Sequence, residues 1–132
     1  MFRAVERTSP DYRRLMNTNT ADTHTGGFPY LNSDRCIQSW TDIYREALAT
    51  IEWIGDPRLR EIYEMWNHTN ERRDGEMMKN LTMYCARHDV ARGVFLVGAA
   101  HRKAMIDRAF AGDGAGSTRI EWDLGGFLGE AS

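Results

Sequence analysis

The amino-acid sequence predicts an α/β fold, in which N-terminal helices lead into a β-α-β unit that forms a small sheet. Between residues 32 and 88, apolar side chains recur at helical spacing, as on the buried face of amphipathic helices. The pattern then changes to a continuous apolar run at Gly93–Gly98, a helical stretch at residues 101–111, and an alternating run at Ile120–Leu124. Two strands joined by a helix imply a right-handed crossover and hence an α/β sheet.

By composition, the chain divides into an N-terminal arm, residues 1–31, and a single α/β domain, residues 32–132. The arm contains a polar stretch rich in turn formers, Asn17–Gly27, which predicts weak structure. Such an arm is either disordered or lies over another chain.

Helix boundaries follow from residues that favour the ends of helices. The first strong helix begins after Asn32 or Ser33, either of which can cap it, and ends at Gly55. The pair Asp56–Pro57 opens a second helix, because Asp is a favourable cap and Pro suits the first position. A third helix is predicted at about residues 74–88. The second and third helices are either separate or one bent helix.

The two predicted strands make a thin sheet. The run Gly93–Gly98 has no polar alternation, which is typical of a strand buried on both faces. Ile120–Leu124 alternates and fits a half-buried strand at a sheet edge. A lone pair of strands is marginal in water. Either the N-terminal arm adds a strand or a second chain completes the sheet, so we expect a homodimer or another protein partner.

The composition argues against several classes of protein. The 132 residues are 42% hydrophobic and 27% charged, which is typical of one soluble domain. A net charge of -2 argues against a general nucleic-acid binder. The longest apolar stretch, Gly93–Ala100, is too short to span a membrane, and the polar first residues resemble no secretory signal. Since Cys36 and Cys85 are spaced as neither a disulfide framework nor a zinc site, we expect a cytoplasmic protein.

The segment Phe95–Arg102 is the most informative for chemistry. A predicted strand ends at Gly98, and His101 and Arg102 follow at the start of the next helix. Ligands bind at the carboxyl ends of strands in open α/β sheets, so these three residues are candidate site residues. A histidine there can act as a general base or a metal ligand. Alternatively, His101 caps the helix or bonds to a neighbouring carbonyl group.

This segment and one upstream of it form a combined motif. Its residues are, in order, Arg73, Asp74, Met77, the apolar run 94–97, Gly98 and His101. In order and spacing they resemble the end of the TraB/ChaN/erythromycin-esterase-like superfamily, where an Arg-(Asn/Asp/Glu)-x-x-Met helix, an apolar strand and a Gly-x-x-His turn follow one another. The resemblance covers roughly residues 28–110 and is closest to a branch of bacterial proteins with the sequence GAAHR.

The resemblance implies a cleft in which His101 faces Arg73, whose planar guanidinium would hold a small anionic ligand. Glu76, one turn further on, is the third candidate catalytic residue; alternatively, Arg73 and Glu76 form only a surface ion pair. Superfamily members also carry an early Gly-x-x-His or Gly-Glu-x-His element, which has no counterpart here. The chain therefore resembles the second half of such a domain. Either a partner supplies the other half of the site, or the catalytic site is lost.

The sequence indicates no metal and no identifiable cofactor. The histidines have none of the spacings that are typical of metal sites; they are His24, His68, His88 and His101. A haem role, as in the ChaN branch, would need an axial ligand and a wide apolar cleft, and the sequence indicates neither.

Two functions remain. The favoured one is a truncated TraB/ChaN-like domain that acts as a non-catalytic binding or assembly module and forms a dimer. The alternative is a hydrolase-like enzyme with His101 as general base or metal ligand and Arg73 as anion clamp. Acidic or histidine side chains of a second chain close to His101 would favour the enzyme. An isolated or buried His101 would favour the module.

Overall fold

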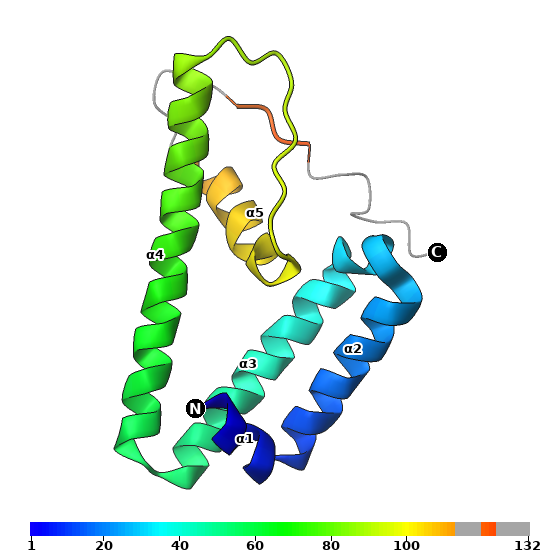
Figure 1. Ribbon diagram of the computed structural model, residues 1–132, viewed down its shortest axis with the longest axis vertical. Coiled ribbons are helices and arrows are strands. Elements are labelled where there is room, and N and C mark those ends of the chain that lie inside the picture. The colour runs from blue at the N-terminus through cyan, green and yellow to red at the C-terminus, as the bar shows by residue number, and fades with distance from the viewer. Residues whose placement is uncertain (113–119, 124–132) are drawn as a thin grey trace. The chain divides into compact units, whose positions relative to one another are not determined.

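The computed structural model describes residues 1–112 and 120–123. Over these residues the chain is helical (Figure 1). The elements are α1 (Phe2–Thr8), α2 (Pro10–Leu31), α3 (Asp34–Ile54), α4 (Pro57–Arg87), the 3-10 turn η1 (Ala99–His101) and α5 (Arg102–Ala111). They belong to two compact units, Met1–His68 and Thr69–Ser132, and α4 passes from the first into the second.

The predicted α/β fold is wrong. No strand occurs in the described residues, and neither Gly93–Gly98 nor residues 120–123 form part of a sheet. Leu124 lies outside the described residues. An apolar run becomes a strand only when a neighbouring strand accepts and donates its backbone hydrogen bonds, and β-propensity measures that context rather than the segment itself. The described part of the chain provides no such neighbour for Gly93–Gly98.

The expected weakly structured arm is also absent, because residues 2–31 form α1 and α2. The polar stretch is held in helical form by the packing of α2 against α3. Within it, the threonine hydroxyl groups donate to carbonyl groups one turn earlier: Thr20 Oγ1 to Met16 O at 2.9 Å, and Thr23 Oγ1 to Asn19 O at 2.8 Å. The stretch does break once. Gly27 has φ 50° and ψ -138°, which kinks α2 just before its last turn.

The core of the first unit lies between α1, α2 and α3. It is built from apolar side chains of all three helices: Val5, Tyr12, Ile43, Ala47 and Ile51. The members from α3 are spaced four residues apart and therefore share one helical face. Figure 1 shows α2 and α3 side by side, as expected for helices joined by only two residues. Aromatic rings extend the core toward α4, where Trp66 packs edge-on against Phe2 and Tyr44.

The predicted ends of α3 and the predicted start of α4 are confirmed. Ser33 caps α3, accepting a hydrogen bond on its hydroxyl oxygen from Cys36 N, and Gly55 ends the helix in the left-handed region with φ 72°. Asp56 Oδ1 accepts a hydrogen bond from Arg58 N at 2.9 Å at the start of α4. The open question about the next helices is also settled, because residues 57–87 form one continuous helix.

The second unit contains the second half of α4 and the segment that follows it. Asp74, Met78 and Thr82 are buried, and their four-residue spacing places them on one face of α4. After α4 the chain runs as an irregular segment to η1 and α5 (Figure 1). On α5, Met105 is buried, and Gly112 ends the helix with φ 73°.

Candidate functional site

The Gly98-x-x-His101 turn and the Arg73-Asp74 helix meet in the second unit. His101 Nδ1 lies 2.7 Å from Asp74 Oδ1, so the two side chains share a hydrogen bond across 27 positions of sequence. Asp74 belongs to the buried face of α4, with a side chain only 9% exposed, while the His101 side chain is 22% exposed. The bond fixes the imidazole by its Nδ1 atom and leaves Nε2 as the nitrogen available to another group.

The partner of His101 is therefore Asp74, whereas the resemblance implied that His101 faces Arg73. Arg73 is exposed. Since Asp74 points to the buried face of α4, its sequence neighbour Arg73 lies about 100° round the helix. Glu76 is also exposed and pairs with Lys79 Nζ at 3.8 Å. His101 therefore contacts the predicted segment of α4, but its partner is Asp74 and not the neighbouring Arg73.

Gly98 and Arg102 flank the histidine. His101 N donates to Gly98 O at 2.9 Å, which closes the turn. Gly98 has φ -61° and ψ 141°, an extended conformation that any residue adopts, and a Cβ added there would meet its nearest neighbour, His101 Cδ2, at an ordinary 3.8 Å. The turn does not require glycine. Arg102 is buried at the first position of α5, rather than directed over an open edge.

The sequence did not predict the contact between Asp74 and His101. Asp74 was part of the motif but not among the candidate site residues. A signal was present, because Asp74 stands in the same four-residue series as Met78 and Thr82. A carboxylate on a predicted buried face needs a partner, and a histidine elsewhere in the chain is a suitable one.

Chemically, the pair allows two roles. A carboxylate that accepts from one imidazole nitrogen orients the ring and supports a positive charge on it, as in a general base. The same bond also holds the turn before α5 against α4. A second contact does the same, since Arg108 Nη2 of α5 donates to Glu71 O of α4 at 3.1 Å. These two contacts therefore link the turn and α5 to α4, and they leave Nε2 of His101 available to another group.

The segment Gly93–Gly98 is the second notable feature of this unit. Val94 and Leu96 are 88% and 80% exposed, whereas Phe95 and Val97 are half-buried. This alternation is that of an extended chain with one face covered. Among the described residues, the backbone of residues 93–97 forms no hydrogen bond to other backbone groups. The segment is thus strand-like in its side-chain pattern but has no neighbour.

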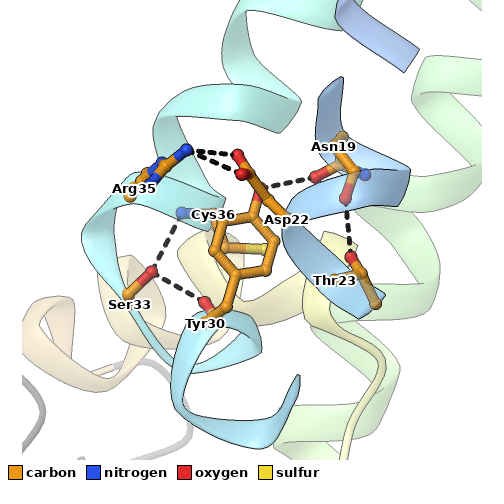
Figure 2. Close-up of polar contacts among 7 residues, drawn as sticks. All are labelled: Asn19, Asp22, Thr23, Tyr30, Ser33, Arg35 and Cys36. Carbon is orange, nitrogen blue, oxygen red and sulfur yellow. Dashed lines mark hydrogen bonds and ion pairs between the residues drawn. The ribbon is translucent and has the colours of Figure 1, made fainter. Parts of the chain in front are cut away.

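A polar cluster in the first unit joins α2 to α3 (Figure 2). The Tyr30 hydroxyl donates to Asn19 Oδ1 at 2.7 Å, and both side chains are buried. Arg35 Nη2 contacts both Asp22 carboxylate oxygens, at 2.6 and 2.7 Å. Burial raises the pKa of Tyr30 above its ordinary value of 10.0, so the phenol keeps the proton that it donates.

The rest of the cluster serves the start of α3. Ser33 Oγ donates to Tyr30 O at 2.7 Å and accepts from Cys36 N at 3.2 Å (Figure 2). Cys36 is buried, so its thiol is closed to ligands. These contacts explain how the kinked end of α2 is held against α3. They form a structural element rather than a reactive site.

Comparison with known proteins adds no family. No family model, no curated protein and no solved structure matches the chain. Within residues 1–112 and 120–123, no three His, Cys, Asp or Glu side chains are grouped so that they could hold a metal ion. No helix in the described part of the chain has both the length and the apolar character that crossing a bilayer requires.

Proposed function

We propose that this protein is a non-catalytic assembly module, in which Gly93–Gly98 pairs with the same segment of a second copy. The observation that carries the proposal is the exposure of Val94 and Leu96 on a segment whose backbone is free of ladder hydrogen bonds within the described residues. An extended segment of this kind can add to another extended chain through main-chain hydrogen bonds, while its side chains provide the fit.

The absence of protection along the segment supports this proposal. Exposed edges of monomeric proteins are usually blunted by charged residues, above all lysine, or by proline. The run from Gly93 to Ala100 has neither a charged residue nor a proline. Left open, such an apolar, β-branched run is an aggregation hazard, and a stable partner removes that hazard.

A second copy suits this segment because the segment is complementary to itself. In an antiparallel pair related by a two-fold axis, directly opposite residues lie on the same face. With the axis at Phe95, Val94 of each copy lies opposite Leu96 of the other. The symmetry produces this contact twice, so the exposed side chains of both copies pack against each other. Gly93 and Val97 then oppose each other at both ends of the paired stretch 93–97, which contains no charged residue. The next position outward would place Gly98 opposite Arg92 of the other copy.

Sedimentation-velocity centrifugation of the purified chain tests the proposal. The wild type is expected to sediment as a dimer that dissociates on dilution. Leu96→Lys is expected to sediment as a monomer with unchanged helical circular dichroism, because two lysines would be buried among apolar side chains. Phe110→Lys is the matched control, since Phe110 is 78% exposed on α5, outside the segment. A monomeric wild type, or a Leu96→Lys dimer of wild-type affinity, would overturn the proposal.

The Asp74–His101 bond favours a second candidate, the hydrolase-like enzyme suggested by the TraB/ChaN resemblance. In it, His101 Nε2 takes a proton from water while Asp74 holds the ring, and Arg73 binds the anionic part of the substrate. The test is saturable hydrolysis of p-nitrophenyl esters that carry a carboxylate or a phosphate. Hydrolysis that His101→Gln abolishes and Arg73→Ala weakens through KM would support this candidate. Hydrolysis equal to that of buffer would exclude it for this class of substrate.

A further inference from the structure

A surface depression lies in the first unit, where the start of α2 meets the last turns of α3. Its volume is about 280 Å³. Its lining comes from two short stretches, Thr8–Asp11 and the α3 residues Glu46, Ala49, Thr50 and Trp53. Trp53 is 79% exposed, which is unusual for a side chain of this size. The core of the unit does not use this ring.

Glu46 is held in a fixed orientation on this lining. Its Oε1 atom accepts hydrogen bonds from Ser9 Oγ at 2.7 Å and from Thr50 Oγ1 at 3.2 Å. Ser9 is in turn fixed as the cap of α2, because its Oγ accepts from Tyr12 N at 2.9 Å. Oε2 makes no hydrogen bond or ion pair to the described part of the chain, so one acceptor stays open.

The charged groups of the lining favour a positively charged ligand. The lining contains two carboxylates, those of Asp11 and Glu46, and no Lys, Arg or His. Asp11 is partly neutralised by Arg14 at 3.1 Å, on the solvent side. The last turn of α3, which carries Trp53, has no basic residue to offset the negative end of the helix dipole. The apolar wall is formed by Pro10, Ala49 and the indole.

From this arrangement we infer a binding site for a cationic side chain on an apolar stem, that is, a lysine of a partner peptide. The ammonium group donates to Glu46 Oε2 and lies over the Trp53 ring, whose face attracts cations. The methylene stem packs on Pro10 and Ala49. The site is independent of the Gly93–Gly98 segment, so it provides the proposed module with a second contact of different chemistry.

Indole N–H resonances in a ¹⁵N-correlated spectrum test this inference. The chain has four tryptophans, and Trp53→Phe assigns the signal of interest. The probe is N-acetyl-lysine methylamide, and the matched control is the uncharged N-acetyl-norleucine methylamide of the same stem. The lysine probe is expected to shift the Trp53 indole signal saturably at millimolar concentration, while the signals of Trp40 and Trp66 stay in place.

Two variants separate the parts of the site. Glu46→Gln keeps an oxygen acceptor for both hydroxyl groups and is expected to weaken binding about fivefold, the value of one solvated charge pair. Trp53→Ala is expected to weaken binding about threefold, the value of an exposed cation–π contact, with binding followed at the Ala49 amide. Equal shifts with the norleucine probe, no saturable shift with the lysine probe, or full binding by Glu46→Gln would each overturn the inference.

Discussion

His101 Nδ1 lies 2.7 Å from Asp74 Oδ1, joining the turn before α5 to the buried face of α4. After α4 ends at Arg87, the segment before η1 runs back along the helix as far as Asp74, and this hydrogen bond holds its end there. That distance is about 20 Å along the helix at 1.5 Å per residue. Gly93–Gly98 belongs to this returning segment, and its side chains alternate between exposed and half-buried as in a strand. The pair thus fixes one end of the segment that we propose to be the interface.

The first prediction concerns this pair. His101→Ala is expected to lower the free energy of unfolding by about 1–3 kcal/mol, because Asp74 is left buried without its partner. Asp74→Ala should cost a similar amount, and the double variant less than the sum, with a coupling of about 0.5–3 kcal/mol. Urea denaturation followed by circular dichroism measures all three.

Glu76→Gln is the control for this cycle and should change stability by less than about 0.5 kcal/mol, since Glu76 is exposed. Unchanged or raised stability in His101→Ala would contradict a structural link. That result would favour a histidine retained for activity at a cost in stability, and hence the hydrolase-like candidate.

The second prediction compares two glycines. Gly55→Ala is expected to cost about 1–2 kcal/mol, because alanine is strained at the left-handed φ of 72° there. Nothing lies within 4 Å of an added Cβ, so the cost is purely conformational. Gly98→Ala should be neutral within about 0.5 kcal/mol, since its φ of -61° suits any residue. Thermal unfolding of both variants measures the difference. A larger loss in Gly98→Ala than in Gly55→Ala would show that the turn is under a constraint other than φ.

The third prediction concerns alkaline pH. Burial raises the pKa of Tyr30 above 10.0, so above that pH the unfolded state loses this proton while the folded state still holds it. The stability that comes from the neutral phenol is full below pH 10 and falls as the pH rises toward the folded-state pKa. Tyr30→Phe is expected to unfold with a shallower decline of stability above pH 10.

Two further features qualify this alkaline experiment. Burial also raises the pKa of Tyr12 and of Tyr63, so part of the decline remains in Tyr30→Phe. At neutral pH the variant should be less stable by about 1–3 kcal/mol, because Asn19 Oδ1 loses its buried donor. Urea titrations at several pH values measure both effects. An equal or steeper alkaline decline in Tyr30→Phe would contradict the assignment.

The fourth prediction concerns backbone amides of the proposed interface. If Gly93–Gly98 pairs between two copies, amide exchange in residues 94–97 should slow as protein concentration rises, because main-chain bonds form only in the dimer. Amides in the middle of α3 serve as the internal reference and should not respond. Hydrogen–deuterium exchange with mass spectrometry resolves both segments. Rates in residues 94–97 that are the same at every concentration would argue against this pairing.

Some elements could be predicted from short stretches of sequence. The start of α3 after Ser33, its end at Gly55 and the start of α4 at Asp56 each depend on one or two residues that satisfy helix ends locally. The helical arm was not predictable in this way. The polar residues of α2 have turn-forming preferences, and their helix is stabilised by packing against α3 and by the Tyr30–Asn19 bond.

The candidate site was predictable only in part. The histidine was found because it follows a glycine and an apolar run, which is a local pattern. Its partner Asp74 is 27 positions away, and the distance between them depends on how α4 and the returning segment fold together. The motif indicated the correct stretch of α4. The packing of α4 decides which of these residues is buried. Asp74 lies on the buried face of the helix, and Arg73 lies on the exposed face.

By itself, the sequence determined where α3 begins and ends, where α4 begins and which side chains are apolar, because capping and helical spacing act within a few residues. The tertiary structure decided whether the apolar run Gly93–Gly98 becomes a strand and which carboxylate meets His101. A strand is defined by hydrogen bonds to a neighbour, and within the described residues the chain supplies none. Such long-range partners depend on the fold as a whole. The helical spacing of Asp74 indicates that its carboxylate is buried and needs a partner, but not which residue that partner is.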